Sequence, residues 1–267
     1  MSTVLPPTRY RRATAILASE WIKLRSVRSL PSVLLAAALF CLTLAALVCS
    51  NYQARWSHLS AQQRLEFNPT DTSLGNLQLS VLFFGVLGCL VVTSEYGRGL
   101  IRVTLAATPQ RAVVLAAKAT LFGVLGWLAN TAICLLTFLT GQSLLTRPAP
   151  HASLGDPGVL QAVLGAGTYL SLVGLFGLFL GVLLRSTAAT ISAVTGVFLV
   201  LPVLVNSLPR TPTWQHTVPY LPADAGIGMW HSKIEYLLTS WQGTGVLTLY
   251  VTGLGIAAFL RIRWWDA

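Results

Sequence analysis

The sequence predicts an all-α, polytopic membrane protein with six transmembrane helices. Of its 267 residues, 54% are hydrophobic and only 10% are charged, whereas a soluble domain carries about 25% charged residues. The apolar residues also gather in six stretches, each close to the roughly 20 residues that a helix needs to cross a bilayer. These stretches are 30–49, 74–93, 113–140, 159–184, 187–205 and 244–260.

The basic residues indicate how these helices are oriented. The chain has 18 Lys and Arg residues and a net charge of +10, and almost all of these residues lie outside the apolar stretches. Thirteen fall in segments on the same side as the two termini, and five fall in the opposite segments. Because Lys and Arg accumulate in cytoplasmic loops, we expect a multi-pass protein of the plasma membrane with both termini in the cytoplasm. The charge thus indicates topology rather than a nucleic-acid partner.

The segment before the first apolar stretch predicts an amphipathic helix. Trp21 and Leu24 share an apolar face at helical spacing, and the basic residues Lys23 and Arg25 lie off this face. Such a helix lies in the membrane interface and binds anionic headgroups. Glu20 interrupts the apolar face, where it either pairs with Lys23 one turn further on or contacts another cytoplasmic element.

The segment 94–112 connects the second and third apolar stretches. Gly99 permits a sharp break in the chain, and the residues that follow resemble a short helix. Ile101 and Leu105, one helical turn apart, present an apolar knob between basic residues. This pattern is typical of an element that docks onto a partner, and a plain interfacial helix is the alternative.

Two further segments have informative composition. In the stretch 159–184, Gly167, Gly174 and Gly181 follow a heptad spacing that lets helix backbones approach closely, either within the bundle or at a subunit interface. The segment 206–243 is rich in proline and aromatic residues. Proline breaks helices and aromatic residues favour the headgroup level, so we expect external, re-entrant short helices that do not cross the membrane.

Several function classes lack their residues in this sequence. The apolar stretches contain no Asp, Glu, His or Arg, and their one lysine, Lys118, is expected to extend to the interface. Ion-coupled transport usually needs such residues inside the membrane. The sequence has no GxxxxGK[ST] phosphate-binding loop, no HExxH or CxxC pattern and no nucleophile elbow. We therefore expect no catalytic residue, no metal site and no cofactor bound by this chain, and the cysteines are interpreted as packing residues.

Three groups of phrases, taken in order, resemble the type-2 ABC transporter permeases, especially those of actinobacteria. They are Glu20-Trp-Ile-Lys-Leu-Arg25; then Glu95, Gly99-Leu-Ile-Arg102, Leu105-Ala-Ala-Thr-Pro109 and Arg111; and finally Pro219-Tyr-Leu-Pro-Ala-Asp-Ala-Gly226. The likeness covers most of the chain, which would form a single permease domain, 1–267. Leu100 stands where the family usually has threonine, and Ala223-Asp224 replaces the commoner Ser-Asn.

The resemblance implies a role for each group of residues. Residues 1–29 would form the elbow helix, with Glu20, Trp21, Lys23 and Arg25. The segment 94–112 would contain the coupling helix that docks into a cleft of the ATPase, with Glu95, Gly99, Ile101, Arg102, Leu105, Pro109 and Arg111. The segment 206–243 would gate the outer mouth, with Tyr220, Pro222 and Gly226.

On this resemblance the chain is the permease subunit of an ATP-driven ABC exporter. Two permeases, expected to form a homodimer, would work with two ATPase subunits that hold the ATP and Mg²⁺. The cargo would be lipophilic or amphipathic (a drug, an antibiotic peptide or a lipid), as in multidrug efflux and antibiotic resistance. The candidates for lining the substrate cavity are Gln78, Phe83, Phe84, Asn130 and Phe198. An ATP-independent channel or assembly factor is the alternative.

Overall fold

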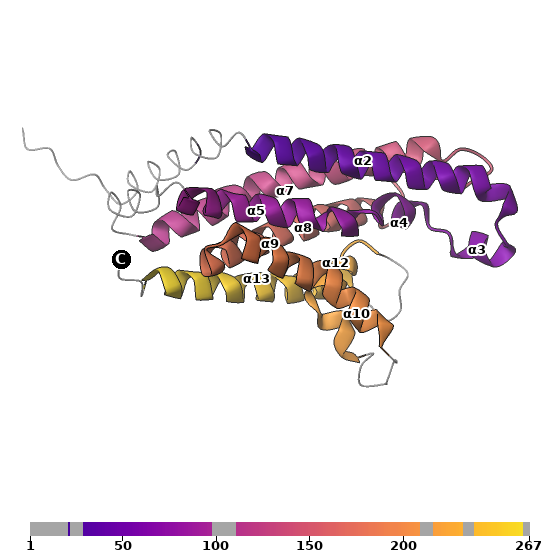
Figure 1. The fold of residues 1–267 in the computed structure, drawn as a ribbon. Helices are drawn as coiled ribbons and strands as arrows, with labels where there is room; N and C mark the ends of the chain where they lie inside the picture. The colour runs from indigo at the N-terminus through magenta and orange to yellow at the C-terminus, as the bar shows by residue number, and fades with distance from the viewer. Residues whose placement is uncertain (1–20, 22–28, 98–110, 209–215, 232–237, 264–267) are drawn as a thin grey trace, which may run out of the picture.

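The structure, a computed structural model, describes residues 21, 29–97, 111–208, 216–231 and 238–263 (Figure 1). This part of the chain is helical and contains no strand. Six of its helices are long and apolar enough to span a membrane. The expected fold class, an all-α polytopic membrane protein, is therefore confirmed.

The long helices alternate in direction through the bundle. They are α2 (Ser29–Arg55), α5 (Leu77–Gly97), α7 (Arg111–Leu144), α8 (Val159–Leu184), the continuous run α9–η2–α10 (Thr187–Ser207) and α13 (Ser240–Arg263). The short helices are η1 (Trp56–His58), α3 (Ala61–Glu66), α4 (Pro69–Leu74), η3 (Val218–Tyr220) and α12 (Pro222–Ile227). Helix α2 begins and α13 ends at the left of Figure 1, termed here the near end, and α3 and α4 lie at the opposite, far end.

Helix α8 is the centre of the bundle, because it packs against α5, α7 and α13 and most of its residues are buried. Glycines allow the backbones of α5 and α8 to touch. A Cβ atom on Gly88 would overlap the carbonyl of Gly174, and one on Gly177 would overlap the carbonyl of Gly85. The glycines of α8 therefore pack within the bundle, which confirms the first of the two interpretations of their spacing.

Helix α2 packs through a stripe of small residues. Ala37, Cys41, Ala45 and Cys49 recur every four residues and are fully buried, and α2 contacts α7 and α5. The thiol of Cys41 donates a hydrogen bond to Ser80 Oγ at 3.1 Å. All four cysteines of the chain are free and buried, which confirms their interpretation as packing residues.

The fifth long helix changes its hydrogen bonding within the membrane span, where Gly196–Val200 (η2) form a π turn. Pro202 follows, and because proline has no N–H it cannot donate to the carbonyl of Phe198 four residues before it. That carbonyl instead accepts a hydrogen bond from Gln78 Nε2 of α5 at 3.0 Å. Gln78 Oε1 in turn accepts a hydrogen bond from the Tyr169 hydroxyl of α8 at 3.0 Å. A side chain thus supplies a donor to a carbonyl whose partner in a regular α-helix would be the proline, as a membrane interior requires.

Three details differ from the sequence predictions. The second span begins at Leu77 rather than at residue 74, because Asn68 caps a separate short helix, α4, that ends at Leu74. Helices α2, α5 and α7 also continue past the apolar stretches, because the backbone hydrogen bonds of a helix do not require apolar side chains. Finally, Lys118 is only 5% exposed and does not extend to the surface. Its neighbours Leu115 and Ala117 are also buried, so this turn of α7 faces the bundle.

Candidate functional site

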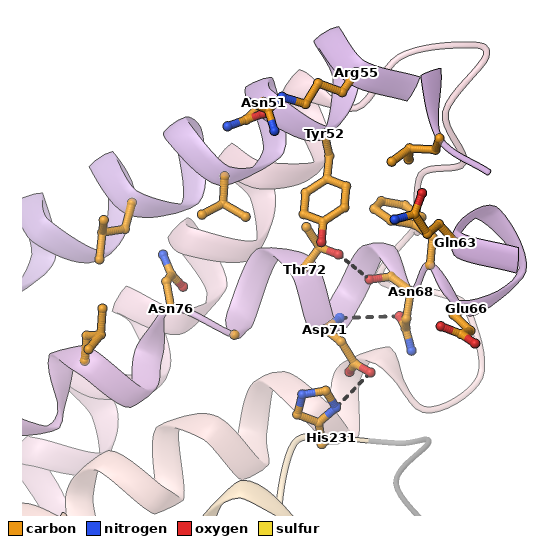
Figure 2. A pocket seen from close by; sticks show the side chains of 16 residues that line it. Asn51, Tyr52, Arg55, Gln63, Glu66, Asn68, Asp71, Thr72, Asn76 and His231 are labelled. Atoms are coloured by element: carbon orange, nitrogen blue, oxygen red, sulfur yellow. Dashed lines mark hydrogen bonds and ion pairs between the residues drawn. The ribbon is translucent and has the colours of Figure 1, made fainter. Parts of the chain in front are cut away.

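A cavity of about 880 Å³ opens at the far end of the bundle, between α2 and the α3–α4 segment (Figure 2). Its size lies within the range of small-molecule sites. The lining residues are Leu44, Val48, Asn51, Tyr52, Arg55, Leu59, Gln63, Glu66, Phe67, Asn68, Asp71, Thr72, Gly75, Asn76, Leu79 and His231.

The α2 wall of this far-end cavity changes from apolar to polar along the helix. Leu44 and Val48 line its inner part, and Asn51, Tyr52 and Arg55 follow at helical spacing toward the end of α2. The rise of an α-helix places Leu44 and Arg55 about 16 Å apart along the axis. The cavity is therefore elongated and amphiphilic.

Local capping forms the opposite wall. Ser60 and Gln63 make a capping box at the start of α3, in which Ser60 Oγ accepts from Gln63 N at 3.2 Å and Gln63 Oε1 accepts from Ser60 N at 3.0 Å. Asn68 Oδ1 caps α4 by accepting from the backbone N–H groups of Thr70 and Asp71, at 3.0 and 3.3 Å. These short-range contacts explain why the chain turns twice between α2 and α5.

An aromatic cluster joins the two walls. The ring of Phe67 lies 5.3 Å from that of Tyr52 and 5.0 Å from that of Trp56, measured between ring centroids. Tyr52 and Phe67 line the cavity, and Trp56 is buried behind them. The guanidinium of Arg64 lies 5.9 Å from the centre of the Trp56 ring. These contacts hold the end of α2 against the α3–α4 segment.

Long-range hydrogen bonds fix α4 and the start of α5 to the bundle. Gln142 of α7 donates to the carbonyl of Pro69 at 2.9 Å and to Ser73 Oγ at 2.8 Å. Asn76 Nδ2 donates to the carbonyl of Cys41 in α2 at 3.0 Å. The polar wall is thus supported by side chains of other helices, which is the arrangement that a preorganised site needs.

Asp71 and His231 join the cavity wall to the segment that follows α12. His231 Nδ1 lies 2.9 Å from Asp71 Oδ2, and both side chains are largely buried (Figure 2). His231 lies shortly after α12, and the chain there folds back onto α4 and so brings its ring to Asp71. The pairing was not visible in the sequence, since the two residues are far apart in the chain and belong to no motif.

Two of the three predicted gate residues, Pro222 and Gly226, are buried against the bundle. Tyr220 is 54% exposed. Pro222 is buried and occupies the first turn of α12, where its missing N–H costs nothing. Gly226 is buried against the ring of Tyr169, which a Cβ atom at this position would overlap.

Asp224 is a buried carboxyl within this same helix, α12. It is 5% exposed, and its Oδ2 atom has no hydrogen-bond partner among the described residues. Burial raises the pKa of Asp224 from its ordinary value of 3.8 to about 6, against a smaller lowering by a backbone hydrogen bond. The protonation of Asp224 therefore changes at pH values that occur in cells and their surroundings.

The five predicted substrate-cavity residues lie elsewhere. Phe84, Asn130 and Phe198 are buried in the core, and Phe83 is partly buried. Gln78 makes the two hydrogen bonds to the fifth long helix and α8 described above. None of the five lines the far-end cavity of this single chain.

Most of the predicted elbow and coupling residues lie outside the described residues. Trp21 is described, and its side chain is 43% exposed. For Glu95 and Arg111 the structure describes the backbone, which places Glu95 in α5 and Arg111 at the start of α7. The residues outside the described part are Glu20, Lys23, Arg25, Gly99, Ile101, Arg102, Leu105 and Pro109.

Comparison with known proteins does not identify a relative: no protein-family model matches the chain, and no curated protein matches its sequence. Fold and site together define a six-helix membrane protein with an amphiphilic cavity at the far end of the bundle. Its function must therefore be inferred from the residues of the chain itself.

Proposed function

We propose that this chain is the permease subunit of an ATP-driven ABC exporter, which moves a lipophilic or amphipathic substrate out of the cell. The observation that carries the proposal is the amphiphilic far-end cavity in a bundle of six spans. A ligand with an apolar and a polar part matches the change along the α2 wall from Leu44 to Arg55.

Active export by this chain would need energy supplied by another protein. The spans of the chain contain no Asp, Glu, His or Arg in their apolar stretches for ion coupling, and its sequence has no phosphate-binding loop. A separate ATPase subunit is therefore part of the proposal. The segment 94–112, with its apolar knob and basic edges, is the proposed docking element, as the resemblance to type-2 ABC permeases implies.

Helix α5 connects the two proposed functional regions. Its start, Leu77, lies between Asn76 and Leu79, which both line the cavity. Its end, Gly97, lies within the segment 94–112. The helix has 21 residues and is therefore about 31 Å long. A displacement of its near end by an ATPase would reach the cavity, provided that α5 makes different contacts with its neighbours in the two states.

The working unit is proposed to hold two copies of this chain and two ATPase subunits in the plasma membrane. In this arrangement the near end faces the cytoplasm, in agreement with the basic residues of that side, and the far-end cavity faces outward. The proposed cargo is a drug, an antibiotic peptide or a lipid.

The first test is purification of the tagged chain from its native host in a mild detergent. Mass spectrometry and an ATPase assay then identify its partners. A stoichiometric nucleotide-binding subunit is expected. A homomer without ATPase, reproduced in lipid nanodiscs, would contradict the exporter function and support the channel or assembly factor.

A substitution then tests the docking element. Ile101→Asp introduces a charge into the apolar knob and is expected to abolish association with the ATPase and transport. Ile101→Leu, which keeps the knob apolar, is the matched control and should retain both. Unchanged association of the Ile101→Asp chain would show that the segment 94–112 is not the docking element.

A further inference from the structure

We propose that the far-end cavity binds an amphiphile with a zwitterionic headgroup, in which an ammonium and an anionic group such as phosphate lie close together. The inference rests on the proposed function, because it names the class of substrate that the permease would carry.

Two opposite charges line the cavity without neutralising each other. Arg55 ends α2 and Glu66 ends α3, so that they approach the cavity from different walls (Figure 2). Both side chains are exposed. Glu66 accepts a hydrogen bond from the neutral Gln62, and neither Arg55 nor Glu66 forms an ion pair with any described residue. A ligand that carries both charges offers an opposite charge to each of these groups.

The aromatic cluster favours an ammonium beside Glu66. Tyr52 and Phe67 line the cavity with their rings 5.3 Å apart and tilted by 50° to each other. Aromatic faces attract cations, above all quaternary ammonium groups. Tyr52 lies between Arg55 and the α4 wall in Figure 2. The cavity therefore combines a carboxylate and aromatic rings for the cation with a guanidinium for the anion.

The inner end of the cavity suits the apolar part of the same ligand. Leu44, Val48 and Leu79 line it, and Leu79 is 55% exposed at the surface of the single chain. An acyl chain or a ring system placed there would pack against these apolar side chains, whereas a polar group at this end would find no hydrogen-bonding partner among them. A soluble zwitterion such as an amino acid would leave this inner end unused.

Ligands of other charge fit less well. A cationic amphiphile leaves Arg55 unpaired, an anionic one leaves Glu66 unpaired, and a sugar headgroup pairs with neither. The Asp71 carboxylate differs from Glu66 in that its Oδ2 atom already has a partner in the cavity wall, His231 Nδ1 at 2.9 Å.

The test uses four photoactivatable amphiphiles that share one decyl tail with a diazirine. Their headgroups are phosphocholine, trimethylammonium, phosphate and maltose. The purified full-length chain, in nanodiscs of phosphatidylglycerol, is irradiated with each probe and its adducts are mapped by mass spectrometry. Adducts on Leu44, Val48 and Leu79 report the cavity. Adducts on Leu128 of α7, which is 55% exposed and lies outside the cavity, correct for partition of each probe into the lipid.

The corrected cavity labelling is expected to be highest for phosphocholine. Exposed ion pairs contribute modestly, so Arg55→Gln should lower phosphocholine and phosphate labelling about two- to fivefold. Glu66→Gln should lower phosphocholine and trimethylammonium labelling by a similar factor. Arg147→Gln is the matched control, because Arg147 is exposed and lies outside the cavity.

Each other outcome overturns the proposal. Equal corrected labelling by all four probes would show that the cavity does not distinguish between headgroups. Preference for trimethylammonium or phosphate alone would show selection for a single charge. The wild-type comparison does not depend on either variant folding, and it needs no ATPase. Failure here with a copurifying ATPase would remove the substrate class and leave the exporter function intact.

Discussion

The hydrogen bond from Gln78 to the carbonyl of Phe198 is expected to contribute measurably to the free energy of unfolding. Gln78→Leu removes this bond and the bond from the Tyr169 hydroxyl, each 3.0 Å long. A buried acceptor left without a donor costs about 1–3 kcal/mol, and a lost hydrogen bond costs roughly 1 kcal/mol. We therefore expect Gln78→Leu to lower the free energy of unfolding by about 2–4 kcal/mol. Gln161→Leu is the control, since Gln161 is exposed on α8.

A second substitution isolates the contribution of the carbonyl. Pro202→Ala restores an N–H group that can donate to Phe198 O within a regular helix. In that background Gln78→Leu should cost about 1–3 kcal/mol less, because the carbonyl keeps a donor. The assay is reversible unfolding in mixed micelles, with the four proteins forming a double-mutant cycle. Equal costs of Gln78→Leu in the two backgrounds would refute the assignment of Gln78 as the replacement for the missing backbone donor.

Three further predictions concern the bundle, its orientation and its pH dependence. Gly88→Ala places a methyl group against the carbonyl of Gly174 and should lower the free energy of unfolding by about 1–3 kcal/mol in the same assay. Gly126→Ala is the control, because open space surrounds Gly126 and its substitution should have no such effect. Equal effects of the two substitutions would contradict the close contact between α5 and α8. Ser57→Cys at the far end should react with an impermeant maleimide in intact cells, since the native cysteines are buried; reaction only after permeabilisation would reverse the topology. Burial raises the pKa of Asp224 from 3.8 to about 6, so the folded protein retains a proton that the unfolded chain releases between these values. Stability should therefore be highest below about pH 4 and fall until about pH 6, by at most about 3 kcal/mol, and Asp224→Asn should abolish this fall; an unchanged pH profile in the variant would assign it to other groups.

The positions of the long helices could be predicted because the membrane acts on short stretches of sequence. An apolar run of sufficient length spans the bilayer whatever lies elsewhere in the chain. The glycine spacing of α8 was informative for the same reason, since Gly174 and Gly181 must lie on one face of any helix. Such properties need no knowledge of the partner helix.

The far-end cavity could not be predicted in this way. Asn68 and Pro69 are a recognisable helix start, and with Gly75 they could have revealed α4 as separate from α5. The pairing of Asp71 with His231 and the support of α4 by Gln142 depend on contacts between distant segments. Likewise, Pro202 in a helical stretch indicates that one backbone N–H donor is absent, but only the fold shows that Gln78 donates to the carbonyl of Phe198.

These contacts give α5 a special position among the six spans. It touches the backbone of α8 through Gly88, holds the fifth long helix through Gln78 and forms the cavity wall with Leu79. Since close-packed helices shift as units rather than deform, α5 cannot move at the near end without changing one of these contacts. Gln78 lies one residue from Leu79 of the cavity wall, and its bond to Phe198 is made by a side chain, which can rotate without a change in the backbone of α5. A permease that couples an ATPase to the far-end cavity through α5 would therefore change the geometry of this bond between its two states.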